Sequence, residues 1–328
     1  MTLATGIGSW PGTSIREAIV TTRDLLLAGD GLGVPYLPEV PGRGPGADII
    51  GRAAGLLVDL PVDLQPSGWR LVGRPGRDAA RTSSLWRADL DELAEAYDGY
   101  QGPLKVQVAG PWTLGAALEL TRGERVLLDP GATVDLIASL AEGIRVLLAD
   151  VTRLVPGAEV ILQVDEPSLP AVLAGEVPTA SGYGRLRAID RGVAVRGIRE
   201  VLAAHPGATV VHCCHPYAPI PLLRECDPGA LALDLTGASP TRWESIAATL
   251  DGGIGLYAGV FPTDGTGSVR AAVRAVLDGF EQAGLGAQHL THLTVTPACG
   301  LAGLSLVQAR GLHQRVVDAA RELSEVDG

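Results

Sequence analysis

Histidine and cysteine side chains come together in one short stretch of the chain, and another cysteine follows a later apolar run. His212 and Cys214 stand two residues apart where an apolar run ends, so on a strand both side chains would point to the same side. Cys299 follows a second run and can approach from another strand end. Imidazole nitrogen and thiolate sulfur are ligands that zinc prefers in tetrahedral sites. These residues predict a Zn2+ site, with Asp234 as candidate fourth ligand.

The predicted zinc site points to chemistry on a thiol. A catalytic zinc ion usually keeps one position exchangeable, and a weakly held carboxylate such as that of Asp234 can leave when a substrate thiol arrives. Coordination lowers the pKa of the thiol, so a zinc-bound thiolate is available near neutral pH. Glu39 and Asp165 are then free for a substrate ammonium, and Ser9 with nearby backbone N–H groups for a carboxylate. An amino-acid thiol fits this inventory.

Neighbouring side chains allow structural roles as well. Cys213 and Cys226 are expected to be core thiols, and His215 either lines the pocket or caps its loop. Of the adjacent carboxylates Asp165 and Glu166, one is expected to act on the substrate and the other to hold a loop.

The same two alternatives hold for four larger side chains. Arg43 and Arg52 stand in a Gly-rich stretch, where they contact an anionic ligand or form structural ion pairs. Trp10 and Trp112 either form a wall of the pocket or pack at the barrel rim.

The elements that would position these residues form a regular pattern. Short apolar runs alternate with longer segments of helical period, which is typical of βα units. The predicted strands are residues 3–8, 33–38, 104–109, 159–164, 209–213, 231–235, 254–259 and 292–296. The second is the weakest, because Pro35 and Pro38 lack backbone N–H groups. We therefore predict a single (β/α)8 TIM barrel over residues 1–328.

Helical periods fill the spaces between the strands. The predicted helices are residues 14–28, 133–154, 188–204, 241–249, 268–283 and 305–323, with Ser268 and Ser305 as N-caps. Residues 41–102 are too long for a plain connection, so the segment between the second and third strands is elaborated. It is expected to hold helices near 47–57 and 85–97 and a hairpin near 68–72.

The candidate site residues gather where the predicted strands end. Ser9 follows the first strand, Glu39 the second and Asp165 the fourth, while His212 and Cys214 end the fifth. In barrel enzymes the carboxyl ends of the strands form the face that carries the active site.

Composition narrows the cellular setting. The chain of 328 residues is 46% hydrophobic with a formal net charge of −11. The absence of a basic cluster argues against nucleic acid or a membrane surface as partner. No apolar run is long enough for a membrane span and no leader peptide is evident, so a cytoplasmic protein is expected. The four cysteines are too few for a disulfide scaffold.

Several motifs, in this order along the chain, resemble the C-terminal catalytic barrel of cobalamin-independent methionine synthase, in the superfamily of uroporphyrinogen decarboxylase. They are IGSWPGT at 7–13, YLPE at 36–39, AGPWT at 109–113, LQVDEPSL at 162–169, VHCCHP at 211–216 and TPACGL at 296–301. The resemblance covers most of the chain. It implies a zinc-dependent methyltransferase of methionine biosynthesis that methylates a thiol, homocysteine.

The resemblance also assigns roles to residues. It implies that Ile7, Ser9 and the neighbouring backbone bind the homocysteine carboxylate. Glu39 and Asp165 would meet the substrate amine and are the candidate catalytic carboxylates. His212, Cys214 and Cys299 would ligate zinc, and Asp234 is the best match for a ligand that is usually glutamate in the family.

The chain departs from the family where the methyl donor binds. Val260 stands in place of a histidine, and Ala117 near the place of a tryptophan expected to stack on folate. Full-length members have a second, N-terminal barrel that helps to bind folate, and only one barrel is predicted here. The donor therefore stays open between methyl-folate and a methylated corrinoid protein.

Three other functions fit parts of the pattern. A related alkyltransferase would use the same zinc chemistry on a different thiol or electrophile. A metal-free enzyme of the uroporphyrinogen decarboxylase type would need arginines near the barrel mouth. A zinc-binding interaction module would bind metal without acting on thiols.

Overall fold

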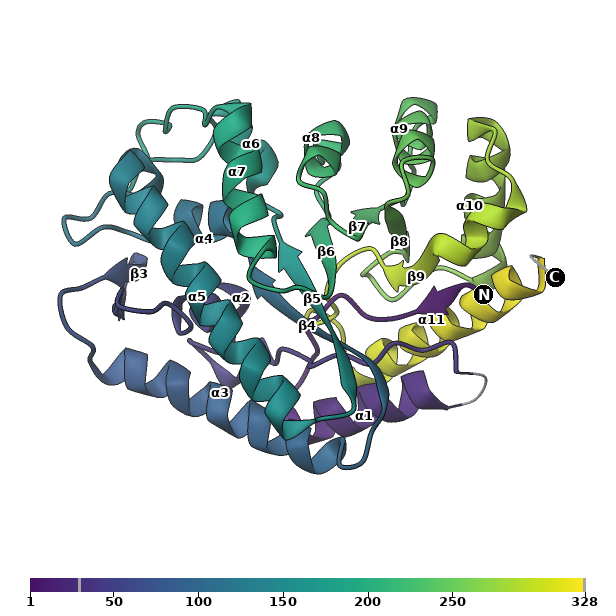
Figure 1. The fold of residues 1–328 in the computed structure, drawn as a ribbon, viewed down its shortest axis with the longest axis horizontal. Coiled ribbons are helices and arrows are strands. Elements are labelled where there is room, and N and C mark those ends of the chain that lie inside the picture. Colours follow the sequence, from purple (N-terminus) through teal and green to yellow (C-terminus); the bar gives the residue numbers. More distant parts are fainter. Residues whose placement is uncertain (29–30, 327–328) are drawn as a thin grey trace.

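Seven parallel strands form one curled sheet, and helices pack around its outside (Figure 1). This computed structural model describes residues 1–28 and 31–326. In spatial order the strands are β1 (Leu3–Ala4), β9 (Leu293–Pro297), β8 (Gly255–Phe261), β7 (Ala230–Asp234), β6 (Ala208–Cys213), β5 (Ala158–Asp165) and β4 (Gly102–Ala109). The strands that come first and last along the chain, β1 and β9, pair in parallel, with Leu3 opposite Thr294. The predicted TIM-barrel fold is confirmed.

The predicted second strand, residues 33–38, closes the barrel without forming a regular ladder. Its backbone bonds to Ala4 of β1 on one side and to Lys105 of β4 on the other, at 2.8 to 2.9 Å. The segment therefore occupies the place of a barrel strand. Because Pro35 and Pro38 cannot donate hydrogen bonds, only isolated bridges form there.

All six predicted helices are present, with ends that shift by less than about one turn. They are α1 (Ile15–Leu27), α5 (Pro130–Leu154), α7 (Arg191–Leu202), α9 (Pro240–Leu250), α10 (Val269–Ala283) and α11 (Leu306–Val326). The predicted caps are in place. Ser268 Oγ accepts from Ala271 N at 3.2 Å, and Ser305 and Gln308 bond reciprocally as in a capping box.

Several short helices that the sequence did not predict lie in the connections between the strands. They are α4 (Pro111–Ala117), α6 (Leu169–Ala174), α8 (Ile220–Glu225) and the 3₁₀ turns η2 (Val126–Leu128) and η3 (Ala287–His292). At three to seven residues they show too few turns for a helical period to be visible in the sequence.

The elaborated segment between the second and third barrel strands has the predicted content. It comprises η1 (Pro41–Arg43), α2 (Ile49–Ala54), the hairpin β2 (Val62–Gln65) with β3 (Gly68–Leu71), and α3 (Arg77–Ala96). Helix α3 begins earlier than predicted, because its first two turns are polar and mostly exposed and so carry no apolar period.

The strands alternate between the barrel interior and the outer core. Val210, Ala232 and Tyr257 form a small interior cluster with Ile7, whereas Cys213 belongs to the large core between sheet and helices. His212 therefore points into the barrel and Cys213 into its wall. Cys213 is a core thiol, as predicted.

Candidate metal and active site

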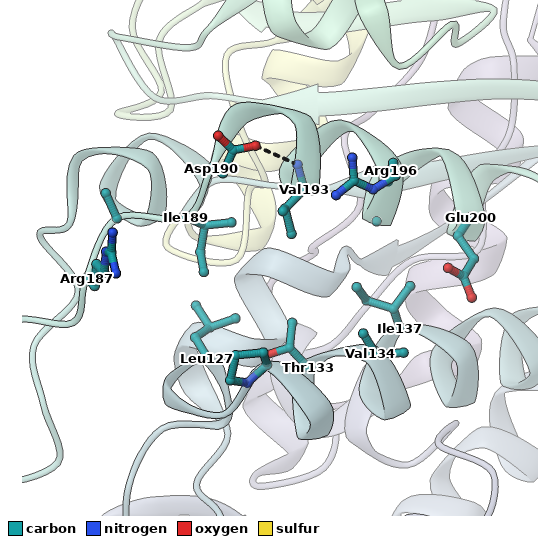
Figure 2. A pocket seen from close by; sticks show the side chains of 13 residues that line it. Leu127, Thr133, Val134, Ile137, Arg187, Ile189, Asp190, Val193, Arg196 and Glu200 are labelled. Carbon is teal, nitrogen blue, oxygen red and sulfur yellow. Dashed lines mark hydrogen bonds between the residues drawn. The ribbon is translucent and has the colours of Figure 1, made fainter.

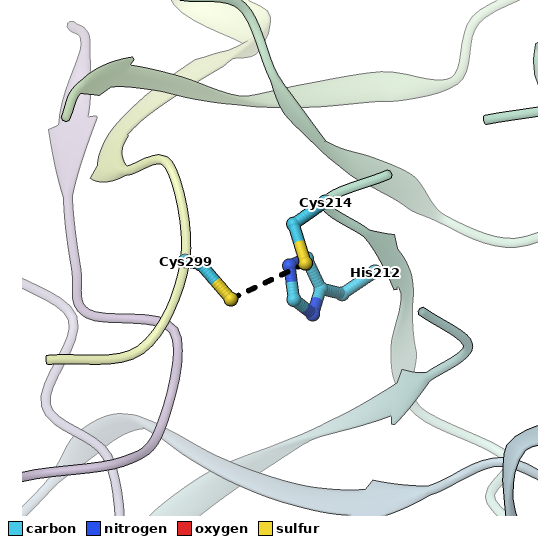
Figure 3. A group of neighbouring side chains, drawn as sticks. All are labelled: His212, Cys214 and Cys299. Atoms are coloured by element: carbon cyan, nitrogen blue, oxygen red, sulfur yellow. Dashed lines mark hydrogen bonds between the residues drawn. The ribbon is translucent and has the colours of Figure 1, made fainter. Parts of the chain in front are cut away.

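Three side chains that could hold a metal ion meet at the carboxyl end of the barrel. His212 stands on β6, Cys214 directly after it, and Cys299 after β9; their ligand atoms lie within 4.8 Å of one another. The two sulfur atoms are 3.2 Å apart, with the His212 ring beside them (Figure 3). The strand-end placement inferred from the sequence thus brings all three residues together.

The imidazole of His212 is oriented for ligation. Its Nδ1 bonds Asp165 Oδ1 at 2.9 Å, and β5 and β6 pair these two residues directly. The other nitrogen, Nε2, is buried and finds no hydrogen-bond partner within residues 1–28 and 31–326. A carboxylate on Nδ1 fixes the tautomer that leaves the Nε2 lone pair available to a metal. The residues therefore fit a zinc ion: one nitrogen and two sulfurs, with a carboxylate behind the histidine.

The thiols influence one another's protonation. The hydrogen bond with Cys214 lowers the pKa of Cys299, and burial opposes this shift without cancelling it. The same contact, together with burial, raises the pKa of Cys214. Burial lowers the pKa of His212, but the hydrogen bond and charge of Asp165 outweigh it, so the net shift is upward. The contact between the two sulfur atoms therefore favours the loss of one thiol proton from the pair.

Asp234 lies outside this three-residue group. It ends β7 and is half-buried, and its Oδ1 accepts from Thr236 N at 2.8 Å and from Thr236 Oγ1 at 2.6 Å. The carboxylate thus closes a turn in the ligand-free protein, and its role as a fourth ligand stays a prediction.

A cavity of about 270 Å³ adjoins the group. Its lining includes Ile7, Ser9, Glu39 and Asp165 together with His212 and both cysteines. Ser9 pairs with Glu39 through a backbone bridge, which sets the two candidate substrate ligands side by side. All of the predicted substrate residues therefore border one space next to the thiol pair.

The two adjacent carboxylates divide as expected into one at the site and one structural residue. Glu166 is fully buried and accepts from the backbone N–H groups of Trp112 and Thr113 and from the Thr113 hydroxyl, at 2.7 to 2.9 Å. It holds the turn after β4. Asp165 receives Gln163 Nε2 at 2.7 Å as well as His212, both on Oδ1, so Oδ2 remains for a substrate.

The electrostatic state of Glu39 is set mainly by burial. Its side chain is 3% exposed, and Oε1 has no hydrogen-bond partner in the described chain. Burial raises the pKa of Glu39 to about 7; Arg52 opposes this shift, and Asp165 adds to it. A cation that enters the cavity could bind Oε1 and stabilise the ionised form of Glu39.

Sequence reasoning missed a polar layer beneath the cavity. Lys105 Nζ and Gln163 Nε2 both donate to Ile7 O, at 2.8 and 2.9 Å, and Gln107 Nε2 donates to Leu37 O at 2.7 Å. The signal was present in the sequence, because Lys105 and Gln107 alternate with apolar residues in a buried strand, which places both on the interior face.

The remaining alternatives are resolved by contacts. Arg43 and Arg52 both bind Asp89, so they form structural ion pairs. His215 Nδ1 accepts from Tyr217 N at 3.1 Å and caps its loop. Trp10 is fully buried in the main core.

A larger cavity, of about 540 Å³, lies elsewhere. It runs between α5 and α7, with the apolar side chains of Leu127, Val134 and Ile137 on one side and Val193 on the other, and charged groups at its edges (Figure 2). It contains none of the His/Cys group, so the smaller cavity is the candidate active site.

Among the helices of residues 1–28 and 31–326, none has the length and apolar character of a membrane span.

Fold and site together define a parallel α/β-barrel protein with a His/Cys metal-ligand group on its carboxyl-end face. The family model for the catalytic domain of cobalamin-independent synthase matches residues 1–322. The chain therefore belongs to the cobalamin-independent methionine synthase catalytic-domain family, which confirms the resemblance seen in its motifs.

One solved structure, of low sequence identity, agrees on the fold. A B12-independent methionine synthase from Shewanella sp. W3-18-1, in complex with selenomethionine, is 14% identical with a TM-score of 0.66, covering 98% of both chains. A dihydrodipicolinate synthase from Agrobacterium tumefaciens has 14% identity over 99% of this chain and 78% of its own, with a TM-score of 0.38. A search of curated proteins finds no match.

Proposed function

We propose that this protein is a zinc-dependent methyltransferase that methylates the thiol of homocysteine to give methionine. The observation that carries the proposal is the unpartnered, buried Nε2 of His212 facing two thiols beside a carboxylate-lined cavity. His212, Cys214 and Cys299 would hold the metal, and Asp234 is proposed as the fourth ligand. When bound, zinc supplies the Lewis acidity that lowers the pKa of a coordinated thiol.

The residues around the cavity would fix the amino-acid end of the substrate. Glu39 and the Oδ2 atom of Asp165 offer negative charge to an ammonium group, and Ser9 with the adjacent backbone would receive the carboxylate. Holding both ends directs the substrate sulfur towards the cysteine pair. Such positioning is a large part of catalysis when two reactants must meet.

The transfer itself requires little from acid–base groups. The substrate thiol loses its proton to solvent, its sulfur forms a bond to the methyl carbon, and the bond between that carbon and its donor breaks with the electron pair leaving on the donor. A methylated corrinoid protein satisfies this balance directly. Methyl-folate does so only when its leaving nitrogen gains a proton, for which the proton released by the thiol is sufficient. The solved relative is in complex with selenomethionine, which supports an amino acid of this shape as the ligand.

The cavity lining favours this chemistry over decarboxylation of an anionic tetrapyrrole. No arginine or lysine is among the residues that line it, and the nearby Arg43 and Arg52 are engaged by Asp89. A related alkyltransferase acting on another thiol shares the same metal group, so competition between candidate thiols distinguishes the two.

Zinc K-edge absorption with and without homocysteine tests the proposal. We expect loss of one oxygen ligand and gain of one sulfur ligand on addition of homocysteine. C299S should lose zinc, while C226A, which removes a buried thiol outside the site, should retain it. A spectrum unchanged by homocysteine would contradict thiol activation at this metal, and assays with methyl-folate and methylcobalamin would identify the donor class.

A further inference from the structure

The positive charge nearest to Glu39 comes from the elaborated segment between the second and third barrel strands. Arg52, on α2, is 2% exposed, and its Nε lies 4.0 Å from Glu39 Oε1. Neither atom has a hydrogen-bond partner within the described ranges. Two buried groups of opposite charge thus face each other at a separation that leaves both of these atoms able to bind a third group.

Helix α3 holds Arg52 in this position from two directions. Asp89, which has no exposed surface, accepts a hydrogen bond from Arg52 Nη1. The guanidinium lies 3.8 Å from the centre of the Trp86 ring, and Trp86 Nε1 donates to Arg52 O at 3.0 Å. A guanidinium fixed by a carboxylate and a stacked indole has little freedom to leave.

Charge counting shows why Glu39 belongs to this cluster. Arg43 binds the same Asp89 through two hydrogen bonds of 2.6 and 2.9 Å. One buried carboxylate therefore serves two guanidinium groups and can neutralise only one charge. Glu39 supplies the second negative charge, so the four side chains balance only when Glu39 is ionised.

Other groups that face Glu39 act in both directions. Lys105 and Gln107 of β4 favour its ionised form, whereas Asp165 of β5 opposes it. Of these neighbours Arg52 has the largest effect on the pKa of Glu39. Asp48, which caps α2, lines the same cavity.

We propose that Arg52 is a positioning residue for substrate recognition, whose fixed positive charge favours the carboxylate form of Glu39 and holds it in place to bind the ammonium group of the thiol substrate. The inference rests on the proposed function, in which Glu39 receives that amine. It assigns a purpose to the elaborated segment: α2 and α3 make the barrel selective for a thiol that carries an amino group.

Calorimetric binding to the zinc-loaded full chain tests this with a pair of ligands. Homocysteine carries the amine, and 4-sulfanylbutanoate is the same thiol acid without it. At pH 7 we expect R52M to bind homocysteine at least about tenfold more weakly than wild type, because a protonated Glu39 must first lose its proton. Binding of 4-sulfanylbutanoate should be unchanged. The matched control R87M removes an exposed arginine of α3 and should leave both affinities unchanged.

The pH dependence separates recognition from a general loss of structure. The deficit of R52M for homocysteine should shrink between pH 7 and pH 8.5 as Glu39 ionises. A folded R52M that loses both ligands equally, or neither, would overturn the inference. Should R52M fail to fold, R52Q removes the charge but keeps a polar side chain of similar length, and its selective loss of homocysteine is judged in the same way. Wild-type protein that binds neither thiol would instead overturn the proposed function.

Discussion

Asp165 lies directly opposite His212 in the ladder between β5 and β6, and its Oδ1 is 2.9 Å from His212 Nδ1. The strand register alone sets these two residues together at the barrel rim. The pairing turns the second ring nitrogen of His212 towards Cys214 and Cys299, and it underlies the first prediction.

Removing the carboxylate behind His212 should weaken metal binding. In D165A the imidazole loses the acceptor that fixes its tautomer, and we expect zinc affinity to fall about 10–100-fold. Competition with a chromophoric chelator measures this affinity. D278N, which changes an exposed aspartate of α10, serves as control, and wild-type zinc affinity in D165A would contradict the orienting role.

Asp234 can be tested without disturbing its turn. In D234N the amide oxygen can still accept from the N–H and hydroxyl of Thr236, but the negative charge is lost. We expect zinc affinity to fall at least about tenfold, because an ionised ligand is replaced by a neutral one. T236A disturbs the turn and keeps the carboxylate, so it should bind zinc normally. Equal affinity of D234N and wild type would remove Asp234 from the ligand set.

Glu39 should make stability depend on pH. An ordinary glutamate side chain has a pKa of 4.5, whereas burial raises the pKa of Glu39 in the folded protein to about 7. Between these values the folded state binds more protons than the unfolded state, so the free energy of unfolding falls as pH rises. The glutamine of E39Q does not titrate, so this pH dependence is absent from the variant. From pH 5 to pH 8 it should therefore gain roughly 2–3 kcal/mol relative to wild type.

Urea denaturation in the presence of a chelator measures this difference without a contribution from zinc. E281Q, at an exposed position of α10, should follow the wild-type pH profile. A constant offset between E39Q and wild type at all pH values would show that Glu39 keeps an ordinary pKa.

Asp89 should be important for stability because it is the carboxylate shared by two arginines. D89N leaves Arg43 and Arg52 without that charge in a buried setting, and we expect a loss of about 3 kcal/mol. Denaturation at pH 7 measures the loss, with D91N, an exposed change on the same helix, as control. A loss below about 1 kcal/mol would place the cluster nearer to solvent than its burial indicates.

The sequence was sufficient to predict the metal-ligand group. His212 and Cys214 share a side of one strand, and Cys299 ends another, so strand periodicity and the rule that barrel active sites lie at strand ends were enough. The partner of Arg52 could not be predicted in the same way. Asp89 stands on a separate helix, and its contact depends on how α2 and α3 pack, which no local pattern encodes.

The fold shows the same division between local and tertiary information. Helices with a long apolar period, such as α10 and α11, were located closely. The first strand was predicted over residues 3–8, but only Leu3–Ala4 is regular, because the neighbouring segment with Pro35 and Pro38 cannot supply a continuous ladder. Its pairing on both sides is a tertiary property of barrel closure.

The pairing of the first strand with the last has a consequence for synthesis on the ribosome. Leu3 and Ala4 meet Thr294 and Val295, so the barrel cannot close until nearly the whole chain has emerged from the exit tunnel. Contacts this distant in sequence form slowly. The first-made strand must therefore wait for a nascent partner with its edge open, a setting in which chaperone binding would be most useful. Because Cys299 follows the last strand, the candidate metal site is completed only after all of the barrel strands have been made.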